Sequence, residues 1–344
     1  MPPPPPRRAP LATATALAAP VCAGLVGLWL GETSLAVSLA LWVEPLIWGL
    51  ALYAVLSHLV ARRWATAGAF ALGCVVGVAL LHLPPEPRPV DPVEASWSER
   101  LRECASLVER GQGPVRVVSW TLSAPLQPVD LDTIAAQMPD LVALQGHGLE
   151  SAAQELARRL DGESKLLMGD GGRPVALVAR GAFRVCGAAE DIWEMPLPAW
   201  PTGSARVLLT FPEVVNVGVV PFLVVQLDQP RADWRLLGWP RRVQDGARHV
   251  AALSRALGSQ HLVAVGDFQA PQAFRRQSGH LMGAGLQQAP APATWPARIG
   301  AVQALPVHPL EQVWHGDAWA AGPVYTLDAP PQGREGLAVT LSPD

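Results

Sequence analysis

The longest hydrophobic stretches in the chain lie within its first 83 residues. Three apolar runs, residues 11–30, 35–60 and 64–83, are each long enough to cross a bilayer as a helix. Paired arginines precede the first run and separate the second from the third, at positions 7–8 and 62–63. Because positive loops stay in the cytoplasm, three spans place everything after residue 83 outside it. The alternative, a cleaved signal peptide at the first run, leaves two further spans unexplained.

The pattern changes at residue 84. Residues 84–114 hold a cluster of prolines, which predicts a stiff extended linker, and then a short juxtamembrane helix over residues 97–110. Beyond residue 115, short apolar runs alternate with amphipathic segments. The runs predict strands over 115–120, 141–145, 174–179, 205–211, 222–227 and 262–265, and the segments predict helices over 129–137, 151–160 and 241–257. Residues 115–344 should therefore form one α/β domain.

One of these strands ends in a motif. Residues 261–271 read HLVAVGDFQAP, so the apolar run stops at Gly266 and Asp267 follows at the strand's carboxyl end. This resembles the GDFN signature of the endonuclease/exonuclease/phosphatase superfamily, which comprises metal-dependent phosphoesterases. The resemblance extends from residue 115 to 341. It implies a four-layer α/β/β/α sandwich of two mixed sheets, with Asp267 engaging the attacking water and Gln269 at the position of the phosphate-binding Asn.

The other motif positions depart from the family. Thr121 stands for the Asn of S-W-N, Gln226 for a phosphate-contacting His, and Gly146 for the Glu of L-Q-E, which is the family's principal magnesium ligand. Gly336 stands for the terminal His, the proton-handling base. His147 is adjacent to Gly146, but its side chain points to the other face of a strand, and we interpret it as a surface imidazole.

The resemblance implies two sets of candidate site residues. The catalytic candidates, most of them substituted, are Asp267, Gln269, Gln226 and Thr121, and the metal candidates are Asp267, Glu311 and Glu335. Magnesium needs hard anionic oxygens, and the family's main Glu and base His are both replaced by glycine. We therefore expect no cofactor, or magnesium or manganese if activity remains.

Charge and cysteine positions refine the picture. Residues 1–83 hold four arginines and two glutamates, and the whole chain carries −3, so the remainder carries −5. A mildly acidic domain argues against nucleic acid as the partner.

Cys104 and Cys186 both fall outside the predicted spans, in a disulfide-permissive compartment, and their pairing stays open. An anchor followed by such a domain resembles the family's membrane-anchored bacterial branch, which predicts a multi-pass inner-membrane protein with a periplasmic or extracellular domain.

Two function classes follow. In the first, the domain is a catalytically degenerate binding or scaffold module, with the lipid bilayer and an unidentified extracytoplasmic ligand or protein as partners. In the second, Asp267, Glu311 and Glu335 still gather a divalent ion and give a weak or altered phosphodiesterase or phosphatase. We favour the first, because a phosphate pocket without histidine lacks its acid–base partner.

Overall fold

The computed structural model describes the domain and parts of the segment before it. The described residues are 87–90, 101–106, 108, 113–122, 126–146, 148–167, 174–184, 206–227, 239–268, 275–292, 298–299, 302–303, 311–327, 336–344 and part of 52–75. The chain divides into two compact units, Met1–Pro85 with Ala273–Arg276, and the remainder from Glu86.

In the first unit, the described residues between 52 and 75 are helical. None of the helices that the described residues form is long and apolar enough to cross a membrane. Most of the predicted anchor, residues 1–83, lies outside the described residues, so its three spans stay a prediction. In the second unit, the helix predicted over 97–110 is represented by a helical turn at 101–105, with Leu101 and Cys104 fully buried.

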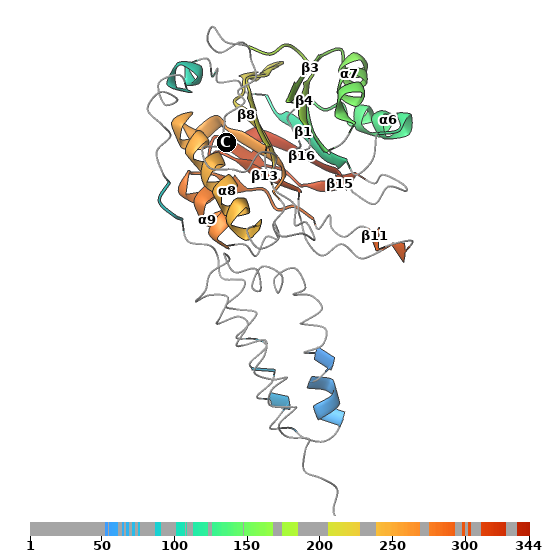
Figure 1. Ribbon diagram of the computed structural model, residues 1–344, viewed down its shortest axis with the longest axis vertical. Helices are drawn as coiled ribbons and strands as arrows, with labels where there is room; N and C mark the ends of the chain where they lie inside the picture. Colours follow the sequence, from blue (N-terminus) through green and yellow to red (C-terminus); the bar gives the residue numbers. More distant parts are fainter. Residues whose placement is uncertain are drawn as a thin grey trace, which may run out of the picture. The chain divides into compact units, whose positions relative to one another are not determined.

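The domain is built on two mixed sheets (Figure 1). The first has the strand order β14-β16-β1-β2-β4-β3, with β15 also paired to β16, and the second has the order β10-β13-β9-β8-β5. The only parallel pairs among the described strands are β1–β2 and β8–β9. The first sheet comprises β1 (Val115–Leu122), β2 (Leu141–Gly146), β3 (Glu163–Leu167), β4 (Val175–Ala179), β14 (Trp319–Ala321), β15 (Tyr325–Leu327) and β16 (Gly336–Pro343). The second comprises β5 (Arg206–Thr210), β8 (Phe222–Gln226), β9 (Val263–Asp267), β10 (Gln287–Gln288) and β13 (Glu311–His315).

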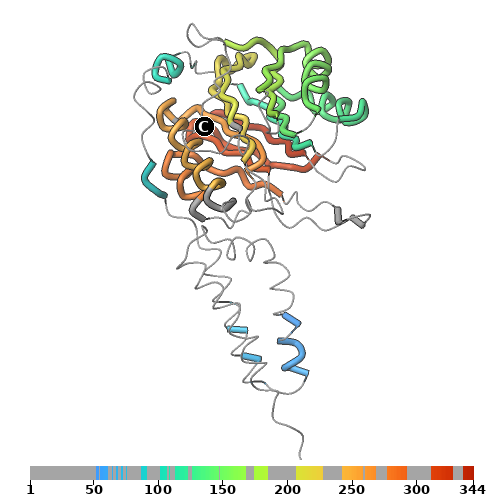
Figure 2. The backbone as a smooth tube through the Cα atoms, viewed as in Figure 1, coloured from blue at the N-terminus to red at the C-terminus, as the bar shows by residue number. Residues whose placement is uncertain are grey.

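Helices cover the outer faces of both sheets (Figures 1 and 2). The pair α6 (Pro128–Ala136) and α7 (Leu149–Leu160) covers the first sheet, and α8 (Trp239–Ala256) and α9 (Arg275–Gly283) lie over the second. A 3-10 turn, η2 (Ser259–His261), leads into β9, and two small hairpins, β6 (Glu213–Val214) with β7 (Gly218–Val219) and β11 (Arg298–Ile299) with β12 (Val302–Gln303), complete the described elements. The α/β/β/α order of layers agrees with the expected sandwich.

The core between the sheets explains why the most apolar strands are central. Side chains of both sheets meet there in one cluster, which includes Val117, Leu141, Val224, Val263 and Val265, all at most 1% exposed. Strands buried on both faces read as continuous apolar runs, and β1, β8 and β9 do so. The strands predicted over 115–120, 222–227 and 262–265 are thus present as β1, β8 and β9, in the interior of the sandwich.

Candidate functional site

The strand register brings five polar side chains to one end of the two sheets. Thr121 pairs with Gln145 across β1 and β2, and Asp267 pairs with Gln226 on β8 and with Glu311 on β13. None of the five is more than 4% exposed. We call Thr121, Gln145, Gln226, Asp267 and Glu311 the buried polar cluster.

Hydrogen bonds join the members of this cluster across the two sheets. The backbone N–H of Thr121 donates to Glu311 Oε1 at 2.5 Å, which ties the first sheet to the second. The Thr121 hydroxyl donates to Gln145 Oε1 at 3.1 Å, and Gln226 Nε2 donates to Asp267 Oδ2 at 3.3 Å. Buried polar groups are stable only when hydrogen-bonded, so these contacts offset part of the cost of burying two carboxylates between apolar layers.

The glycine of the GDF motif has a packing role. Gly266 adopts φ +144°, and a Cβ atom there would lie 2.0 Å from the carbonyl oxygen of Val225 on β8. Only glycine tolerates both the conformation and the close approach of the neighbouring strand. The residue thereby lets β9 stay paired with β8 up to Asp267.

A second glycine stands where the family has its principal metal-binding Glu. Gly146 ends β2 with φ +116°, and a Cβ atom built on it would lie 2.2 Å from the carbonyl oxygen of Leu122. At that distance the backbone itself must move before any side chain fits. In this structure the position has no room for a carboxylate.

A third glycine stands where the family has its base His. Gly336 begins β16 opposite Leu327, and its Cβ would lie 2.6 Å from Cε3 of the Trp120 indole. Trp120 and Leu327 both belong to the core beneath α6 and α7. Gly336 therefore faces the helix-covered side of the first sheet, whereas Thr121 faces the second sheet. The resemblance implies that Gly336 and Thr121 belong to one site, and the structure places them on opposite faces of the first sheet.

Two other sequence candidates, Gln269 and Glu335, lie outside the described residues, and so does His147, which we interpreted as a surface imidazole. Sequence reasoning did not single out Gln145 or Ser119, which point to the same side of the sheet as Thr121. The sequence could have identified both as candidates, since each is a polar residue within an otherwise apolar strand. Gln145 Nε2, Gln226 Oε1 and Ser119 Oγ are buried and have no hydrogen-bond partner among the described residues.

Whether a divalent ion fits this site depends on the oxygen atoms that the buried polar cluster offers as ligands. Asp267 and Glu311 offer the hard oxygens that magnesium prefers, but Glu311 Oε1 already accepts the Thr121 N–H. Gly146 contributes no oxygen from a side chain. Among the described residues, no three His, Cys, Asp or Glu side chains come close enough together to hold a metal ion. The described part of the site therefore offers two carboxylates, Asp267 and Glu311, and the third metal candidate, Glu335, lies outside it.

Comparison with solved structures finds similar proteins, several of which are described as endonuclease/exonuclease/phosphatase proteins. An endonuclease/exonuclease/phosphatase from Beutenbergia cavernae DSM 12333 is 15% identical over 67% of this chain and 72% of that one, with a TM-score of 0.49. The 3′ phosphatase NExo from Neisseria, bound to a product DNA hairpin, is 16% identical over 67% and 99%, with a TM-score of 0.47. A mannosyl-6-phosphatase from Bacteroides thetaiotaomicron VPI-5482 is 13% identical over 66% and 99%, with a TM-score of 0.46. No family model and no curated protein matches the sequence.

The domain is an α/β/β/α sandwich of two facing mixed sheets, and the solved structures that it is similar to include endonuclease/exonuclease/phosphatase family proteins. The two facing mixed sheets, and the GDF turn at the end of the central strand β9, agree with the resemblance that the sequence motif indicates. Identities of 11–16% bear on the fold alone. No activity carries over to this endonuclease/exonuclease/phosphatase-like domain from those proteins.

Proposed function

We propose that this endonuclease/exonuclease/phosphatase-like domain is catalytically degenerate and acts as a binding or scaffold module. The observation that carries the proposal is the backbone at Gly146. Where the family holds its principal magnesium ligand, a side chain would collide with the Leu122 carbonyl at 2.2 Å. A phosphoesterase of this class uses the metal to polarise the phosphoryl group and to activate water.

The contribution of proton transfer to catalysis is affected as well. Gly336 carries no ionisable group, and the Trp120 indole fills the space beside it. General acid–base catalysis contributes about 10²–10⁴-fold to a rate, and a metal several kcal/mol of charge stabilisation beyond that. Both contributions depend on positions that are glycine here. Thr121 donates its backbone N–H to Glu311 and its hydroxyl to Gln145, as expected of a polar interior.

We further propose that the module lies outside the cytoplasm, held to the bilayer by residues 1–83. Cys104 is buried and disulfide-bonded, with its partner beyond the described residues. Disulfides persist in oxidising compartments, which supports export. The ligand is an unidentified extracytoplasmic molecule or protein, and the net charge of −5 after residue 83 argues against nucleic acid.

One observation favours the second candidate function, a weak or altered divalent-metal-dependent phosphodiesterase or phosphatase. Asp267 is retained at the end of β9, with Glu311 directly across the strand pair. If Glu335 joined these two carboxylates, three anionic oxygen ligands would be available to magnesium or manganese.

Hydrolysis of bis-p-nitrophenyl phosphate separates the two functions. The full chain, purified in nanodiscs, is assayed with magnesium and with manganese, and we expect no turnover above background. Asp267→Asn is the test variant, because it keeps the shape of a buried side chain. Asp132→Asn is the matched control, because it removes the same charge from an exposed side chain of α6. Turnover that persists in Asp132→Asn and disappears in a folded Asp267→Asn would make the phosphodiesterase the better assignment.

A further inference from the structure

A surface pocket lies at the end of the first sheet opposite the buried polar cluster. Met138 lies in the turn between α6 and β2, and Arg180 directly follows β4, whose last residue, Ala179, pairs with Leu141. The cluster's Gln145 is at the far end of the same strand pair. The pocket encloses about 420 Å³, a volume within the range of small-molecule sites. Its walls include Met138, Arg159, Leu160, Asp161, Arg180 and Val215.

Two apolar side chains stand open at this pocket. Met138 is 57% exposed and Val215, in the turn between β6 and β7, is 68% exposed. Met138 also adopts φ +47°, a left-handed conformation that suits glycine at a helix end far better than methionine. Neither burial nor backbone preference accounts for a methionine at this place. An apolar part of a bound molecule would give both side chains a contact.

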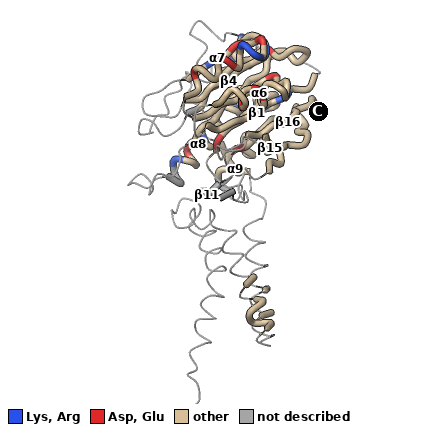
Figure 3. Tube along the Cα trace, turned by 90° about the vertical axis from the view of Figure 1, so that its right-hand side faces the viewer, with Lys and Arg blue, Asp and Glu red and all other residues tan. Residues whose placement is uncertain are grey.

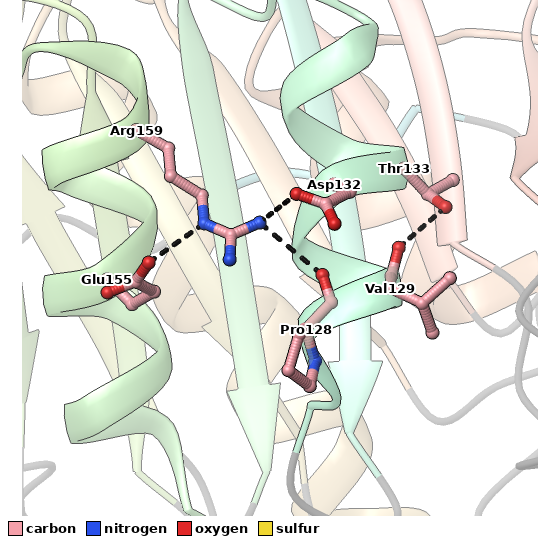
Figure 4. A network of polar contacts seen from close by, with 6 residues as sticks. All are labelled: Pro128, Val129, Asp132, Thr133, Glu155 and Arg159. Atoms are coloured by element: carbon pink, nitrogen blue, oxygen red, sulfur yellow. Dashed lines mark hydrogen bonds and ion pairs between the residues drawn. The ribbon is translucent and has the colours of Figure 1, made fainter.

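One of the two arginines in the wall is held in place before any ligand arrives. Arg159 Nε donates to Glu155 Oε1 at 2.9 Å, and its Nη1 bonds to Asp132 and to the Pro128 carbonyl, so the side chain bridges α7 and α6 (Figure 4). No described residue accepts a hydrogen bond from its Nη2. A guanidinium fixed in this way presents a preorganised donor pair and loses little entropy on binding.

The second arginine is not neutralised. Arg180 is exposed, and its guanidinium has no ion pair or hydrogen bond with any residue that the structure describes. Charged residues of both signs gather over α7 (Figure 3). Glu155 on α7 and Asp132 on α6 offset the charge of Arg159. The charge of Arg180 is therefore the main attraction for an anion. Asp161 in the same wall disfavours a second negative group.

We propose that this pocket binds a small acidic amphiphile, a single carboxylate or phosphate group carried on a short apolar chain. Arg180 and the free Nη2 of Arg159 hold the anionic group, because guanidinium donors match carboxylate and phosphate oxygens. Met138 and Val215 contact the chain. The site is separate from the buried polar cluster and does not depend on whether that cluster is catalytic.

The ε-methyl group of Met138 reports on this binding directly. The chain has five methionines, so ¹³C-methyl labelling of the full chain in phosphatidylcholine nanodiscs gives few signals, and Met138→Leu assigns the relevant one. Hexanoate and hexyl phosphate are titrated as the two anionic probes, with hexanol and hexylamine as the neutral and cationic ones. We expect a saturable shift of the Met138 signal with one or both anions, weakened by added salt, and none with hexylamine.

Two variants decide whether Arg180 recognises the anion. Arg180→Gln should weaken binding about tenfold, whereas Arg116→Gln, which removes the same charge from an exposed position outside the pocket, should leave it unchanged. Melting temperatures of both variants establish that they are folded. The proposal is overturned if neither anion shifts the Met138 signal, if hexanol and hexylamine shift it as strongly, or if the two variants bind equally well.

Discussion

His249 on α8 should make the folded domain sensitive to acid. Burial lowers the pKa of this imidazole from 6.5 to about 4, and its Nε2 is buried without a hydrogen-bond partner among the described residues. The folded state thus keeps His249 neutral at a pH where the unfolded chain takes up a proton. Because the unfolded state then binds more protons, the free energy of unfolding falls as the pH drops from about 6.5 to 4.

The size of this effect follows from the two pKa values. A difference of one pKa unit corresponds to about 1.4 kcal/mol, so the full loss is roughly 3 kcal/mol, reached below pH 4. At pH 5.0, about 2 kcal/mol should already be lost, and almost none at pH 7.5. Such a loss is a large fraction of the stability of an ordinary domain.

His249→Gln tests the reasoning, because glutamine is polar but does not titrate. Urea unfolding of the native chain and the variant, followed by tryptophan fluorescence at pH 7.5 and 5.0, gives the free energy of unfolding of each. Whatever the substitution itself costs at pH 7.5, the native chain should lose about 2 kcal/mol more than the variant between the two pH values. Equal losses in both proteins would show that His249 is not the acid-sensitive group.

Three further predictions concern topology, covalent structure and the site. Alkaline phosphatase fused after Val90 should be active, since residues beyond the third predicted span lie outside the cytoplasm; an inactive fusion would reverse the topology. Peptide mapping without reduction should recover Cys104 linked to Cys186, because both fall outside the predicted spans; recovery of Cys104 with another cysteine would refute this pairing. Gly146→Glu should lower the melting temperature by several degrees, rather than create metal-dependent hydrolysis, because its side chain meets the Leu122 carbonyl. A stable, metal-activated variant would contradict the structural argument.

The parts of the fold that sequence could predict are those with a strong hydrophobic pattern. β1, β8 and β9 are buried on both faces, so their continuous apolar runs identify them without any tertiary information. β3, Glu163–Leu167, was not predicted. It is an edge strand that carries Glu163 and Lys165, and charged residues are how such an edge avoids pairing with other chains. The same charges hide it from a search for apolar runs.

The candidate site divides in a similar way. That Thr121, Gln226 and Asp267 approach one end of the sandwich follows from their positions at the carboxyl ends of central strands. The bond between Glu311 and the backbone of Thr121 could not be predicted, because it joins residues of two different sheets and depends on how the sheets face each other. The orientation of Gly336 depends on the register between β16 and its neighbours, which no sequence motif encodes.

The backbone at the two glycines bears more on function than the missing side chains do. A substitution that changes only the side chain, such as Gln226 in place of His, does not move the strand. One mutation could therefore restore the family's residue at that position. Gly146 and Gly336 differ, because the Leu122 carbonyl and the Trp120 indole occupy the space that a side chain would need. Proteins pack their interiors densely, so restoring either residue requires neighbouring strands or side chains to move as well. A metal ligand at position 146 together with a base at position 336 would therefore need concerted changes at both positions, and this supports the proposal that the domain acts in binding.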